Sequence, residues 1–128
     1  MSHKTESRHH SQDSLVRDFN QAFITSSEHT KDMIKFAENL VRQTGVSASQ
    51  IRTIYGQIKK IQMNGFNQRQ VLLIKPQLAY MKARNKKATS LADVLIKAID
   101  TVDSEADFKR FCEFMEAIVA YHKLHTKS

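Results

Sequence analysis

Apolar residues recur at helical spacing along most of this chain, and short polar connections separate the apolar stretches. The last stretch is the clearest, because its apolar residues fall at i, i+3, i+4 and i+7 positions from Phe108 to His122. This spacing predicts a helix that packs against other helices, and Ser104 with Asp107 provides its N-terminal capping signal. The expected core positions of this helix are Phe108, Phe111, Cys112, Met115, Ile118, Val119 and His122.

The same periodicity predicts three further helices with recognisable ends. The first occupies residues 28–44 and stops at Gly45. The second begins at Ser47, where Gln50 completes a capping box, and ends at Asn64-Gly65. Another begins at Ser90, with Leu91, Val94, Leu95, Ala98, Ile99 and Val102 as its core side.

Between the helix that ends at Asn64-Gly65 and the helix that begins at Ser90, Asn67 can cap a further helix, which contains the only proline, Pro76. Proline removes a backbone donor and disfavours helical geometry at the preceding residue. The helix therefore either kinks at Pro76, or breaks and restarts with Pro76 in its first turn; we favour a kinked continuation to about Asn85. Its expected core residues are Val71, Leu72, Ile74, Leu78, Ala79 and Met81.

The first 27 residues are rich in Ser, His, Gln and Thr and predict a flexible tail. Within it, residues 14–25 could form a short, conditional helix. We therefore expect an all-α protein, a single-domain bundle of about five helices over residues 28–128, preceded by the tail 1–27. The composition agrees, with three glycines, one proline and no tryptophan in 128 residues.

Several features that the sequence lacks limit the cellular location and the chemical activity that we expect of this protein. A single cysteine, Cys112, excludes an intrachain disulfide, and no signal peptide or membrane-length apolar run is present, so we expect a cytoplasmic protein. His122 and His125 have no third ligand nearby in sequence, and Glu113 and Glu116 resemble a solvated helix face. We expect no catalytic residue, metal, cofactor or small-molecule substrate.

Charge is distributed unevenly along the chain. The net charge is +7, and residues 45–88 contain nine basic side chains and no acidic one. A segment without carboxylates favours a polyanionic partner, although acidic residues of the last third could instead neutralise it in the folded protein. On helices, Arg52 and Lys59 would form one positive line, and Lys75, Lys82 and Lys86 a second. Lysine predominates, which favours phosphate contacts over base recognition.

Several blocks resemble the small subunit of the Csm complex, the type III-A CRISPR effector. They are Ser49-Gln50-Ile51-Arg52 with Tyr55 and Ile58-Lys59, the block from Leu73 to Tyr80 with Arg84, and Phe108-Lys109-Arg110-Phe111 leading to the block from Glu116 to Lys123.

The resemblance implies a non-catalytic helical subunit that acts in antiviral defence. It also implies partners: other Csm subunits, further copies of the chain, and target RNA paired with a guide that the opposite subunits hold. From the resemblance and the charge pattern, the candidate RNA-binding residues are Arg52, Lys59, Lys60, Arg69, Lys75, Lys82, Arg84, Lys86 and Arg110.

Two other functions remain open from the sequence. Asn64-Gly65-Phe66 could be the turn of a helix-turn-helix in a DNA-binding regulator, with Gln68, Arg69 and Gln70 entering the major groove. Alternatively, the chain could be a structural adaptor whose basic face meets an acidic protein.

Overall fold

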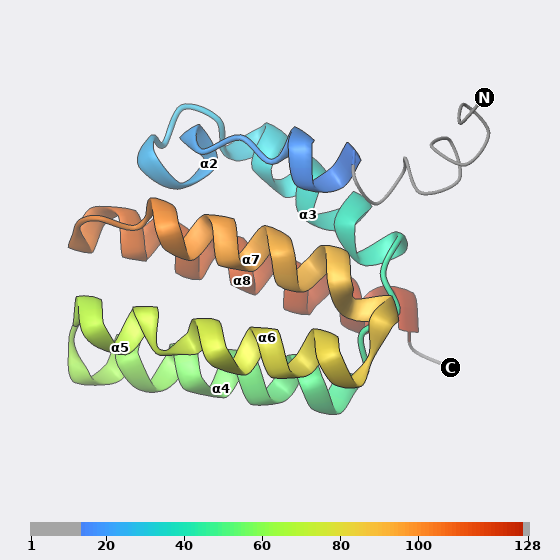
Figure 1. The fold of residues 1–128 in the computed structure, drawn as a ribbon. Coiled ribbons are helices and arrows are strands. Elements are labelled where there is room, and N and C mark those ends of the chain that lie inside the picture. Colours follow the sequence, from blue (N-terminus) through green and yellow to red (C-terminus); the bar gives the residue numbers. More distant parts are fainter. Residues whose placement is uncertain (1–13, 127–128) are drawn as a thin grey trace, which may run out of the picture.

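Helices form all the regular structure of residues 14–126, the part of the chain that the computed structural model describes (Figure 1). The expected all-α bundle is thus confirmed, and residues 1–13 of the predicted tail 1–27 lie outside the described part. Residues 14–18 are helical. The following elements are α2 (Ala22–Thr25), α3 (Thr30–Arg42), α4 (Ala48–Asn64), α5 (Gln68–Leu72), α6 (Ile74–Arg84), the 3₁₀ helix η1 (Lys86–Ala88), α7 (Thr89–Thr101) and α8 (Glu105–Thr126).

The helices lie in three tiers (Figure 1). The middle tier holds α7 and α8, the upper tier holds α2 and α3, and the lower tier holds α4, α5 and α6. Helix α8 contacts α2, α3, α4 and α7, while α6 contacts both α4 and α7. The lower tier is therefore attached to the rest of the molecule by one side only.

Helix α8 supplies the centre of the core, as its periodicity predicted. Phe111, Phe114, Met115 and Ile118 are completely buried. Between its two ends, the helix exposes only a narrow side to solvent, which includes Lys109, Glu113, Glu116, Ala120 and Lys123.

Two of the predicted helix starts are confirmed in atomic detail. The Ser47 hydroxyl accepts a hydrogen bond from the Gln50 backbone N–H, and the Gln50 side chain accepts one from the Ser47 N–H, which is the predicted capping box. At α8, the Ser104 hydroxyl accepts from the backbone N–H of Asp107, 3.1 Å away.

The predicted start at Ser90 is wrong by a short distance. Helix α7 begins at Thr89, directly after η1, and Ser90 is buried inside it. The cap lies earlier, because the Asn85 side chain accepts a hydrogen bond from the Lys87 N–H at the start of η1. Asn85 caps the 3₁₀ turn that leads directly into α7, so α7 begins without a capping side chain at Ser90.

The region of Pro76 differs from the favoured continuous helix. Helix α5 ends at Leu72, Leu73 forms the junction, and α6 restarts at Ile74 with Pro76 in its first turn. A proline is tolerated there because first-turn N–H groups have no partner within the helix. The break also leaves Leu72 and Ala79, two of the expected core residues, exposed.

Residues 14–25, which the sequence assigned to the tail, pack on the bundle. Leu15, Phe19, Phe23 and Ile24 are all buried. The ring of Phe19 lies 5.9 Å from that of Phe114 in α8, measured between centroids. A segment with four large apolar side chains gains more from burying them than from staying solvated.

We predict that Phe19→Ala lowers the free energy of unfolding by about 3–5 kcal/mol, because it empties a site among aromatic rings. Gln21→Ala, at an exposed neighbouring position, should change it by less than about 0.5 kcal/mol. Urea unfolding followed by circular dichroism measures both variants. Equal midpoints for the two variants would show that this segment does not contribute to the stability of the bundle.

Candidate nucleic-acid interface

Helices α4, α5 and α6 form an antiparallel hairpin, the α4–α6 hairpin, whose outer face points away from the middle tier (Figure 1). Helix α4 buries Ile51, Ile54, Ile58 and Ile61 against the bundle. Residues on the opposite side of the helix therefore face solvent, namely Arg52, Thr53, Gly56, Lys60 and Met63. Since residues 45–88 contain no acidic residue, this outer face carries only positive charge.

The first predicted line of cations, Arg52 and Lys59, lies on the flank of α4 nearest α8. Arg52 is exposed, and the Lys59 ammonium lies 5.8 Å from the centre of the Tyr55 ring. Lys60 is exposed on α4, where it borders a hollow together with Asn67 and Gln70, and Arg69 is exposed on α5. Among residues 14–126, none of these four side chains has a carboxylate within ion-pairing distance.

The second predicted line does not form as expected. Lys75 and Lys82 face α7, where their ammonium groups lie 2.5 Å from Asp100 and 2.6 Å from Asp93. The two pairs match because α6 and α7 are antiparallel and each partner lies seven residues from the next. Lys86 lies beyond the end of α6, on η1. Acidic residues of the last third thus neutralise part of the basic segment, which is the alternative that the sequence left open.

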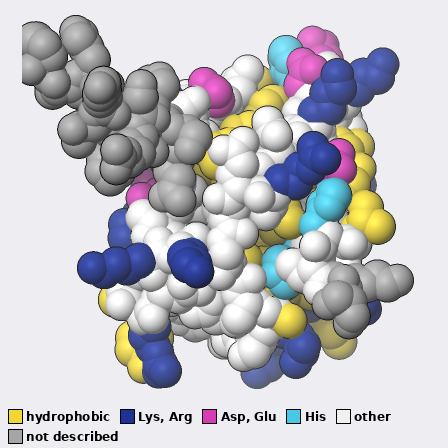
Figure 2. Space-filling view, turned by 90° about the vertical axis from the view of Figure 1, so that its right-hand side faces the viewer, with side chains coloured by type: hydrophobic (Ala, Val, Ile, Leu, Met, Phe, Trp, Pro, Cys, Tyr) yellow, Lys and Arg dark blue, Asp and Glu magenta, His cyan; other side chains and the backbone are white. Residues whose placement is uncertain are grey.

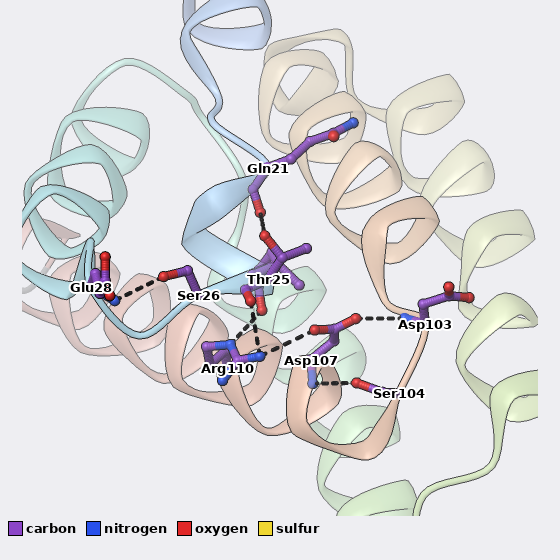
Figure 3. A network of polar contacts seen from close by, with 9 residues as sticks. Gln21, Thr25, Ser26, Glu28, Asp103, Ser104, Asp107 and Arg110 are labelled. Carbon is purple, nitrogen blue, oxygen red and sulfur yellow. Dashed lines mark hydrogen bonds and ion pairs between the residues drawn. The ribbon is translucent and has the colours of Figure 1, made fainter.

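Arg110 is held by backbone groups and a carboxylate of the protein (Figure 3). Its Nε donates to the carbonyl oxygen of Ile24 at 2.6 Å, and one terminal nitrogen donates to the carbonyl of Thr25 and to Asp107, both at 3.2 Å. The other Asp107 oxygen accepts from the backbone N–H of Asp103. The guanidinium therefore ties the end of α2 to the start of α8, and this arrangement favours a structural role over RNA contact.

Arg84 and Tyr80 form a pair on the flank of α6 that faces α4. The Arg84 guanidinium donates to the Tyr80 hydroxyl at 3.0 Å and lies 5.6 Å from the ring centre. Arg84 has no carboxylate partner among the described residues. Its remaining N–H donors are available to an anion.

The outer face of the hairpin is hollowed along its length. One hollow of about 550 Å³ lies between α4 and α6, at the end where Tyr80 and Arg84 project. Two further hollows follow along α4; the first shares Thr53 with it, and the second is bordered by Lys60 and Asn67. Among the described residues, neither glutamate nor aspartate borders any of the three.

Figure 2 shows how charge is separated on one end of the molecule. Asp and Glu side chains appear in the upper half of this view, whereas the lower half, which holds α4 and α6, shows Lys and Arg without acidic neighbours. Such a separation produces a positive surface that attracts a polyanion.

The cysteine and the histidines weighed for catalysis or metal binding lie in the following surroundings. Burial, with a smaller contribution from Glu116, raises the pKa of the Cys112 thiol to about 11, so the thiol stays protonated at neutral pH. His122 is buried against the Val46 carbonyl, and His125 lies 3.1 Å from Glu38. Residues 14–126 contain no cluster of three or more His, Cys, Asp or Glu able to hold a metal. Within the same residues, no helix is long and apolar enough to span a membrane.

A family model described as Csm2 Type III-A matches residues 27–128. The chain belongs to this family. It is thus a small subunit of the Csm complex of type III-A CRISPR systems, which confirms the resemblance seen in its sequence blocks and implies association with other Csm subunits. Comparisons with curated proteins and with solved structures gave no match.

Some residues at this surface were not singled out from the sequence. Lys87 was counted in the basic segment but not named as a site, although it is exposed on η1 next to Lys86. Gln77 was not singled out either, and it borders the hollow between α4 and α6. Tyr80 could have been assigned to the surface from the spacing of Ile74, Leu78 and Met81, which places it off the buried stripe once the break at Leu73 is known.

We predict that Arg110→Ala destabilises the protein by about 1–3 kcal/mol, because it leaves partly buried carbonyl and carboxylate groups without their donor. Lys109→Ala removes the same charge from the exposed side of α8 and should have little effect on stability. Urea unfolding compares the two variants. An Arg110→Ala protein that is as stable as Lys109→Ala but binds RNA with a weaker salt dependence would restore Arg110 to the interface.

Proposed function

We propose that this Csm2-family subunit holds the target RNA strand of the type III-A complex through phosphate contacts made by the outer face of the α4–α6 hairpin. It does so along the channel where the target pairs with the guide, and it thereby contributes to antiviral defence in the cytoplasm. The observation that carries the proposal is the hollowed surface, which cations border and which has no carboxylate in its lining within the described part of the chain.

The cations that support this proposal are those without an acidic partner in the described part of the chain. From the predicted set these are Arg52, Lys59, Lys60, Arg69, Arg84 and Lys86, and Lys87 joins them. An exposed cation without an ion pair has no intramolecular contact to give up when it meets a phosphate. These side chains project from the helices α4, α5 and α6 and from the 3₁₀ helix η1, and they read no base edges, so the binding is independent of sequence.

The helix-turn-helix alternative is weakened by the geometry of α5. This helix has only five residues, and the Gln68 side chain donates to the Val102 carbonyl at 2.9 Å instead of pointing to solvent. Phe66, in the proposed turn, packs on Phe108. A recognition helix needs several side chains free to enter the major groove.

The proposal is tested by two double variants that remove the same charge from different places. Lys60→Gln with Arg84→Gln should flatten the slope of log K against log salt by about 1.4 on single-stranded RNA, since each phosphate contact contributes about 0.7. Lys75→Gln with Lys82→Gln should flatten it much less, because Asp100 and Asp93 already neutralise these lysines. Fluorescence anisotropy across a salt series measures both slopes.

Equal slopes for the two double variants would mean that total charge, and not the outer face, determines binding. If the unmodified protein does not bind RNA at low salt, the adaptor function is favoured. Preference for one DNA duplex over RNA would favour the regulator. The same pairs of changes, introduced into the assembled complex, should weaken target RNA capture only for Lys60 and Arg84, while assembly and guide retention persist.

We further propose that the subunit is not itself a nuclease. The purified chain should leave RNA and DNA intact during long incubation with Mg²⁺ or Mn²⁺, as followed on denaturing gels. Cleavage that persists through repurification and is abolished by a point substitution in this chain would contradict the proposal. Cleavage by the complete complex would not, because another subunit can supply an active site.

A further inference from the structure

The hollow between α4 and α6 is bordered by groups that suit a nucleobase better than a phosphate. We infer that it binds one unpaired base of the RNA strand, with Tyr80 as the stacking surface and Gln77 at the base edge. This inference rests on the proposed RNA-binding function and specifies the ligand at one point of the outer face.

Tyr80 is the first observation. Its side chain is 63% exposed, in a helix whose apolar residues Ile74, Leu78 and Met81 are buried. The ring is nevertheless held in place, because Arg84 bonds its hydroxyl and lies against its face. An exposed aromatic ring that is already fixed loses little conformational entropy when a base stacks on it.

Uncharged side chains that are hydrogen-bonded within the protein also border the hollow. The Asn85 amide donates to the Gln50 side chain at 3.0 Å and to the Gly45 carbonyl at 3.0 Å. The Thr53 hydroxyl donates to the Ser49 carbonyl at 3.0 Å. Amides and hydroxyls offer hydrogen bonds without the charge that a phosphate or carboxylate ligand would require.

Gln77 differs from its neighbours in the hollow. Its side-chain amide makes no hydrogen bond within residues 14–126, although it is half-buried at the rim. An amide offers both donors and an acceptor, so it can match the edge of any base. Arg84, the one cation that residues 14–126 place at this hollow, has donors left for the adjoining phosphate.

Together, these features favour an unpaired nucleotide as the ligand of this hollow. Bases inside a duplex present neither face to a protein ring, whereas a base in a single strand can be unstacked and placed on an aromatic side chain. The hollow, of about 550 Å³, shares Thr53 with the next one along α4, so the strand can continue over the cationic surface.

The test uses the full chain, Tyr80→Ala, and two single-stranded RNAs of equal length, one with bases and one abasic over its central nucleotides. Tyr80→Ala should weaken binding of the RNA with bases by about 5- to 150-fold, the range expected from loss of one stacked base. It should leave binding of the abasic RNA unchanged. The salt slope should stay the same, because stacking releases no counterions.

Two controls separate stacking from other effects of the change. Tyr80→Phe keeps the ring and its contact with the Arg84 guanidinium but loses the hydroxyl that Arg84 bonds, so it should bind more tightly than Tyr80→Ala and keep the preference for the RNA with bases. Leu124→Ala removes another exposed apolar side chain, far along the sequence on α8, and should have no effect.

The outcomes distinguish this inference from the proposed function. If Tyr80→Ala weakens both RNAs equally, Tyr80 acts by positioning Arg84 and the base pocket is wrong. If the unmodified protein binds both RNAs alike and Tyr80→Ala changes neither, the pocket is wrong while phosphate binding stands. If the unmodified protein binds neither RNA at low salt, the proposed function itself fails.

Discussion

Helix α8 is apolar over most of its circumference, and covering it determines where the other helices lie. Phe111, Phe114, Met115 and Ile118 are completely buried, and each such side chain stabilises the fold by about 1.5–3 kcal/mol. One neighbouring helix cannot cover a surface of this width. It is therefore enclosed by α2 and α3 from one side and by α4 and α7 from others. The α4–α6 hairpin consequently uses only its inner side for folding, and its outer side is left for binding.

The basic residues of segment 45–88 fall into two groups, those that form ion pairs with α7 and those that do not. Lys75 and Lys82 meet Asp100 and Asp93 across the junction of α6 and α7, so their charge is largely cancelled beyond the local pair. Lys60 and Arg84 lie on the side of the hairpin that no carboxylate reaches within the described residues. Residues with the same appearance in the sequence thus differ in their availability to RNA.

Local signals were sufficient to predict much of the fold. The capping box at Ser47 and the periodicity of α8 each depend on residues within a few positions of one another, and both are confirmed. Long-range contacts were not predictable in this way. The packing of Phe19 on Phe114, the ion pair between Lys75 and Asp100, and the bond from Arg110 to the Ile24 carbonyl join residues far apart in the sequence. These contacts decide which segment is core and which cations are available, so the candidate site was less predictable than the fold.

Phosphate contacts and the proposed base pocket would select RNA in different ways. Contacts from Lys60 or Arg84 to phosphates respond to charge density, so they favour any polyanion and weaken as salt rises. Stacking on Tyr80 does not depend on salt and requires a base that is free of a partner. Neither contact reads sequence, because every base has an aromatic face and the Gln77 amide can donate or accept. A surface that combines both would prefer an RNA strand with an unpaired nucleotide over a continuous duplex, and it would do so for a target of any sequence.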